Sequence, residues 1–124
     1  MSLGFPKFFA RNLKPVDLLE WAELLQNPEY VPVAFFEDER IQISTVWRGI
    51  DAYLRENRAP IIFETMTFAK QEVLEEWDKC CWRWRTLAEA KAGHAVLTTC
   101  YLDGIDPDEP MAAVKKQFDL LNLH

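Results

Sequence analysis

Glu64 and His94 are the two side chains whose type and position could serve acid–base chemistry. In the alternating run IIFETMTF, Glu64 shares a face with apolar residues. An unpaired carboxylate is costly to bury there, so it needs a partner or must take up a proton. Catalysis would require the two groups to lie within hydrogen-bond reach or to share one water. His94 follows Gly93 on the core-facing stripe of a predicted helix, which favours a structural histidine over a general base.

The segment CCWRWR alternates arginine with tryptophan. In a strand, Arg83 and Arg85 share one face, and Trp82 and Trp84 share the other. If this strand pairs in register with the one before it, the arginines lie opposite Glu64 and form a structural ion pair. The alternative is a polar patch at the mouth of a pocket, where an arginine binds an anionic group and Glu64 accepts from a hydroxyl or base edge. Tryptophan beside arginine is also typical of stacking platforms and of protein-interface hot spots.

No residue spacing indicates a metal or cofactor. Three cysteines and two histidines show no C-x-x-C or H-x-x-x-H pattern, and the acidic run 103–109 lacks the order of a calcium loop. Cys80 and Cys81 are adjacent and Cys100 stands alone, so the sequence predicts no disulfide framework and favours a reducing cytoplasm. Cys100 has no local base to activate it, and we assign it no role. We expect no metal and no cofactor.

Length and charge limit the class of protein. The chain has 124 residues, 49% of them hydrophobic, which predicts a single domain over residues 1–124. A net charge of −6 argues against long nucleic acids, and the isolated glycines form no phosphate-binding loop. We expect no membrane-spanning segment. The basic residues 1–14 contain Phe5, Phe8 and Phe9 and are either a flexible docking arm or, as we favour, a tail packed on the domain.

Periodicity predicts an α+β fold with an antiparallel sheet of about four strands, packed by an N-terminal, a central and a C-terminal helix. The N-terminal helix is expected over residues 15–26 after Pro15, and the central helix over 87–101 behind the capping box T-x-x-E. The C-terminal helix is expected to begin with Asp108 as N-cap and to bury the stripe Met111, Val114, Phe118 and Leu121. The four strands are expected at 31–36, 41–48, 61–68 and 80–85.

Three blocks in fixed order, STVWRGID (44–51), PIIFETMTF (60–68) and WRWRTLAEAKAGH (82–94), resemble a group of small proteins of tailed bacteriophages and prophages. The resemblance implies a phage or prophage origin and a role in the infected or lysogenic bacterial cytoplasm, but no reaction. The motif residues it points to are Asp51, Glu64, Thr65, Thr86, Glu89, Gly93 and His94. The chain departs from the pattern at AYLRENRA (52–59), where similar proteins have a glycine-rich segment.

The leading hypothesis is therefore stoichiometric binding to a host or phage protein, with inhibition of a bacterial anti-phage defence as its concrete form. A second hypothesis is a binder that sequesters a small nucleotide-like ligand. A third is a small enzyme that uses Glu64 and His94 as acid and base. The oligomeric state is left open. The residues assigned to ligand or partner binding are Asp51, Glu64, Trp82, Arg83, Trp84 and Arg85.

Overall fold

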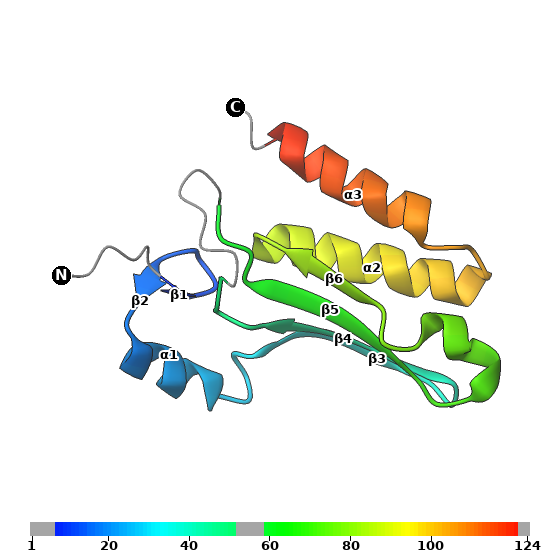
Figure 1. Cartoon of the computed structure of the whole chain (residues 1–124), viewed down its shortest axis with the longest axis horizontal. Helices are drawn as coiled ribbons and strands as arrows, with labels where there is room; N and C mark the ends of the chain where they lie inside the picture. Colours follow the sequence, from blue (N-terminus) through cyan, green and yellow to red (C-terminus); the bar gives the residue numbers. More distant parts are fainter. Residues whose placement is uncertain (1–6, 52–58, 122–124) are drawn as a thin grey trace.

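A computed structural model describes residues 7–51 and 59–121 and has the predicted α+β fold with a four-stranded antiparallel sheet. Figure 1 shows α2 running along one face of this sheet and α3 packed against α2. The sheet runs, in spatial order, through β3 (Pro32–Glu37), β4 (Ile41–Trp47), β5 (Phe63–Ala69) and β6 (Cys81–Trp84). The remaining elements are β1 (Phe8–Phe9), β2 (Pro15–Val16), α1 (Leu18–Leu25), the 3-10 helix η1 (Glu72–Trp77), α2 (Leu87–Asp103) and α3 (Asp108–Leu121).

The two faces of the sheet differ in what packs on them. Along β4, fully buried residues alternate with partly exposed ones, because α2 packs on one side only. We call the side beneath α2 the covered face; it carries Ile41, Ile43, Thr45, Trp47, Phe63, Thr65, Thr67 and Trp84. The other side is the open face, and among the described elements no helix lies across it between α1 and η1 (Figure 1). The open face carries Phe35, Glu37, Gln42, Ser44, Val46, Glu64, Met66, Phe68, Cys81 and Arg83.

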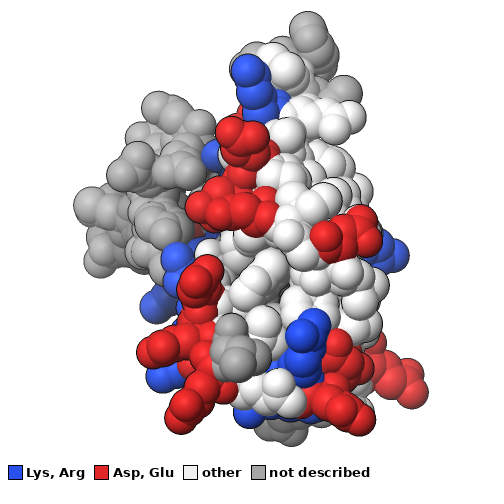
Figure 2. Space-filling view, turned by 90° about the vertical axis from the view of Figure 1, so that its right-hand side faces the viewer, with Lys and Arg blue, Asp and Glu red and all other residues white. Residues whose placement is uncertain are grey.

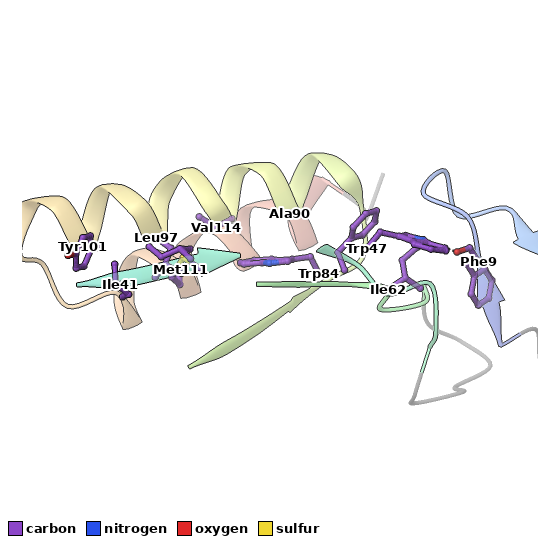
Figure 3. Packing of buried hydrophobic residues seen from close by; sticks show 12 residues of the cluster. Phe9, Ile41, Trp47, Ile62, Trp84, Ala90, Leu97, Tyr101, Met111 and Val114 are labelled. Carbon is purple, nitrogen blue, oxygen red and sulfur yellow. The ribbon is translucent and has the colours of Figure 1, made fainter. Parts of the chain in front are cut away.

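Helix α2 supplies the second layer of the core. The first half of its predicted capping box forms, since Thr86 accepts the N–H of Glu89 at 3.1 Å, but Glu89 Oε1 accepts the N–H of Arg85, at 2.7 Å, in place of that of Thr86. The helix ends at Gly104, which has a φ of 69° that favours glycine. Figure 3 shows the buried cluster that joins α2 and α3 to the covered face, with Trp84 near its middle and Trp47 toward Ile62 and Phe9.

The sequence placed two helix starts wrongly. The N-terminal helix begins at Leu18, because Asp17 caps it by accepting the N–H of Glu20 at 2.8 Å, whereas Pro15 belongs to β2. Asp108 is the first residue of α3 and not its N-cap; its N–H is accepted by Asp106 Oδ1 at 2.9 Å. At the start of each helix, an aspartate side chain accepts the backbone N–H of the residue two or three positions later.

The described part of the N-terminal segment packs on the domain. Phe9 is buried, and its carbonyl accepts the indole N–H of Trp47 at 2.9 Å. The Phe8 ring lies 4.8 Å from the Trp21 ring. Phe5 and the predicted departure at 52–58 lie outside the described residues. In residues 7–51 and 59–121, no helix is both long and apolar enough to cross a membrane.

Candidate functional site

Glu64 lies at the centre of a charged cluster on the open face. Its Oε1 accepts Arg48 Nη1 at 3.0 Å, and its Oε2 lies 3.4 Å from Arg83 Nε. The pairing of β5 with β6 places Arg83 directly opposite Glu64, as the sequence predicted for a register-matched pair. The Glu64 side chain is only 10% exposed, whereas those of Arg48 and Arg83 are 55% and 53% exposed. One shielded carboxylate thus holds two guanidinium groups that face solvent.

A cavity of about 270 Å³ adjoins this cluster. Both arginines and Glu64 line it, together with aliphatic side chains that include Ile50 and Ile61. An arginine has five N–H donors in a planar fork, so a guanidinium held by one carboxylate still has geometry suited to another planar anion. The cavity therefore combines a local positive charge with an apolar wall, in a chain whose net charge is −6.

A mainly apolar row of side chains lies next to the charged cluster. Phe35 is opposite Ser44, Ser44 is opposite Met66, and Met66 is opposite Cys81, so these residues form one row across four strands. Phe35 is 56% exposed. Burial, followed by the neighbouring Glu64 carboxylate, raises the pKa of Cys81, so this thiol is a weak nucleophile at neutral pH.

The covered face carries a buried chain of hydrogen bonds. The Trp84 indole donates to Thr65 Oγ1 at 2.9 Å; the hydroxyls of Thr65 and Thr45 lie 2.6 Å apart; and Thr45 Oγ1 lies 2.8 Å from His94 Nδ1. Indole can only donate, and the distances fit a chain in which Thr65 donates to Thr45 and Thr45 donates to Nδ1 of a neutral His94 ring. Burial lowers the pKa of His94 and favours this neutral form.

The structure separates several residues that the sequence placed together. Thr65 and its partner His94 belong to the covered face, so Glu64, the next residue along β5, points away from His94 and the two do not form an acid–base pair. Trp84 is fully buried and offers no surface for stacking a ligand, because α3 and α2 cover it. Arg85 pairs with Asp119 of α3 at 3.2 Å and not with Glu64.

The remaining two predicted site residues lie elsewhere. Trp82 lies opposite Thr65 on the covered side and is half-buried, away from Arg83 and Glu64. Asp51 is buried, and its N–H donates to the Lys7 carbonyl at 3.0 Å, next to the N-terminal segment. Of the six predicted binding residues, Glu64 and Arg83 are brought together.

Sequence reasoning missed Arg48. Arg48 lies two residues beyond Val46, which is opposite Glu64, so alternation places it on the same face. That signal was present in the sequence, but choosing this arginine required the register between β4 and β5, and the sequence does not give that register.

The three sequence blocks 44–51, 60–68 and 82–94 lie at the centre of the fold. They contain the second half of β4, most of β5 and β6 and the first half of α2, and with them the hydrogen-bond chain and the helix cap. A Cβ on Gly93 would lie 2.2 Å from Trp84 Cζ2, so glycine is what allows α2 to approach β6 this closely. Among the motif residues, Gly93 therefore has a packing role, whereas Thr65, Thr86, Glu89 and His94 make hydrogen bonds that support the fold.

No protein-family model, curated protein or solved structure matches the chain. Within the two described stretches, no three His, Cys, Asp or Glu side chains gather as a metal site requires.

Proposed function

We propose that the chain is a phage or prophage protein that acts by stoichiometric binding to a protein in the infected or lysogenic bacterial cytoplasm, and that the open face is the binding surface. The observation that carries the proposal is the Arg48–Glu64–Arg83 cluster set among exposed apolar side chains on a sheet face that no described helix covers. The origin and the cytoplasmic location rest on the three sequence blocks.

The composition of the open face supports a protein partner. A sheet face turned to water usually carries polar side chains. This face has Glu37 and Gln42 at one end, but it also exposes the large apolar side chains Phe35 and Phe68 beside Val46 and Met66. Arginine beside aromatic side chains is the composition of interface hot spots. A nucleotide-like ligand has less support, because Trp84 is buried and Trp82 faces the other side.

The charge of the open face defines the partner's chemistry. Two half-exposed guanidinium groups share one carboxylate, which leaves the cluster positive within an acidic molecule. The partner is therefore a protein surface that presents an aspartate or glutamate side chain next to an apolar patch. Inhibition of an anti-phage defence protein is the form of this binding that fits a phage origin.

The test is capture of a partner from a lysate of the source bacterium with three forms of the protein. The open-face variant carries Phe35→Ser and Arg48→Glu; the matched control carries Leu102→Ser and Lys91→Glu, at exposed positions on α2. The proposal predicts that the wild type and the control capture the same protein at a one-to-one ratio and that the open-face variant loses it at least tenfold. Equal capture by both variants, or no specific capture by the wild type, would contradict it.

A further inference from the structure

A second and larger cavity, of about 570 Å³, lies at the end of the molecule that faces the viewer in Figure 2. It is formed between η1, the start of β6 and the turn that joins α2 to α3. Its volume is in the range of cavities that hold small ligands. It lies on the covered side of the sheet and shares no lining residue with the cavity beside Glu64.

Aromatic rings form the wall of this cavity. Trp77, Trp82 and Tyr101 line it, and the rings of Trp77 and Tyr101 meet edge to face at a centroid distance of 5.6 Å. Trp82 comes from β6, Trp77 from η1 and Tyr101 from α2, so three separate elements hold the rings in place. Each aromatic face carries a partial negative charge that attracts cations.

Carboxylates dominate the charge around the rings. Glu76, Asp106 and Asp108 line the cavity, and Arg40 is the cation among its lining residues. Arg40 is engaged by the wall itself: its guanidinium lies 5.4 Å from the centroid of the Tyr101 ring, and its Nε donates to the Tyr101 hydroxyl, which donates to Asp38. The ring faces left for a ligand cation are therefore those of Trp77 and Trp82. Figure 2 shows acidic side chains bordering an uncharged strip at this end of the molecule.

We propose that this cavity binds an organic ammonium group, carried either by a small free amine or by a lysine side chain. The rings supply cation–π attraction, and the carboxylates supply the opposite charge. Asp106 also accepts the N–H of Asp108 at the start of α3, so part of its role is structural. Binding is therefore expected to need the aromatic rings and the carboxylates together. Anionic ligands are disfavoured by the same three carboxylates.

The test is an NMR titration of the indole N–H signals of Trp77 and Trp82 with choline at low ionic strength. The matched control ligand is dimethylbutanol, the neutral isostere in which carbon replaces the ammonium nitrogen. We expect choline to shift both signals saturably, with a Kd on the order of millimolar for cation–π binding at a partly exposed site, and the isostere to shift them at least fivefold less. Equal responses to the two ligands, or no saturable shift with choline or with the lysine derivative described below, would overturn the proposal.

Two variants localise the binding. Glu76→Gln, at an exposed position, should weaken choline binding about two- to threefold, and Trp82→Leu about tenfold, by loss of a charge and of a ring face. If Trp82→Leu does not fold, Glu76→Gln still decides the outcome. Unchanged affinity in Glu76→Gln, or in a folded Trp82→Leu protein, would contradict the assignment.

A second ligand separates the two sources of the ammonium group. Tighter binding of N-acetyl-lysine amide than of choline indicates a lysine side chain, and the reverse order indicates a free amine. Cys80 lines this cavity whereas Cys81 lies on the open face, so choline should slow alkylation of Cys80 in a Cys81→Ser protein. Because the test uses neither the open face nor a captured partner, its outcome is independent of the proposed function.

Discussion

Glu64 and Thr65 are neighbours in β5, yet they belong to two different kinds of polar site. Thr65 is fully buried under α2 and takes part in a hydrogen-bond chain whose members belong to β4, β6 and α2. Glu64 lies on the open face and holds two arginines that are more than half exposed. A buried polar group is costly when its partner is lost, but Glu64 keeps a second arginine when one is removed, and ion pairs made by half-exposed arginines contribute little to stability. The comparison indicates that the covered face maintains the fold and that the open face is available for binding.

The largest expected effect comes from Gly93. Substitution Gly93→Val places side-chain atoms within the Trp84 indole, because the Cβ alone would lie 2.2 Å from Trp84 Cζ2. We expect a loss of about 3 kcal/mol in the free energy of unfolding, measured by urea denaturation, since overpacking at a rigid contact costs this much. The control Ala95→Val, at an exposed position on α2, should cost under about 1 kcal/mol. Equal losses of unfolding free energy for the two substitutions would contradict the close packing of α2 on β6.

The second-largest loss of unfolding free energy is expected at Thr65. Thr65→Val keeps the shape of the side chain but removes the hydroxyl that accepts the Trp84 N–H and meets Thr45. Two buried polar groups lose a partner, so we expect a loss of about 2 kcal/mol. The open-face counterpart Ser44→Ala should change stability by less than about 0.5 kcal/mol. A Ser44→Ala effect as large as that of Thr65→Val would show that the two faces do not differ in this way.

The pH dependence of stability tests whether His94 is held in its neutral form in the folded protein. Because burial lowers its pKa in the folded state, the unfolded state binds more protons below about pH 6.5, and stability falls as the pH drops through that value. Burial raises the pKa of Glu89, which acts in the opposite direction. The change in Tm between about pH 7.5 and about pH 5.5 should therefore be compared with that of His94→Leu, where the histidine contribution is absent. A fall in Tm on acidification of the same size in both proteins would mean that His94 does not titrate as the buried chain requires.

The smallest effect is expected on the open face. Arg48→Ala removes a guanidinium that is 55% exposed and leaves Arg83 beside the shielded Glu64 carboxylate, so the free energy of unfolding should fall by only about 1 kcal/mol. The measurement is the same urea denaturation, repeated at high salt, where the difference from the wild type should shrink further. A loss of several kcal/mol would place this cluster in the folding core and weaken the case for a binding surface.

The sequence predicted those parts of the structure that depend on local pattern. Alternation placed Glu64 and Arg83 in pairing strands, and T-x-x-E located the start of α2. It could not predict the contact of His94 with Thr45, because that contact depends on where α2 crosses the sheet.

Short and irregular elements were also missed. β1 and β2 have two residues each, too few to show a period, and η1 has no apolar repeat. The aromatic cavity combines residues from near 40, 76–82 and 101–108, which only the packed structure brings together.

The most direct test of the division between the two faces is the alkylation rate of Cys81. This thiol is exposed on the open face, opposite Met66, and a Cys80→Ser protein allows its rate to be read without its neighbour; Cys100 is buried. In the free protein, Cys81 should react slowly because its pKa is raised, but measurably because it is exposed, whereas the buried Cys100 should not react. In the purified complex with the captured partner, the account predicts that the Cys81 rate falls at least tenfold. An unchanged rate in the complex would show that the partner binds elsewhere and would contradict the assignment of the open face as the binding surface.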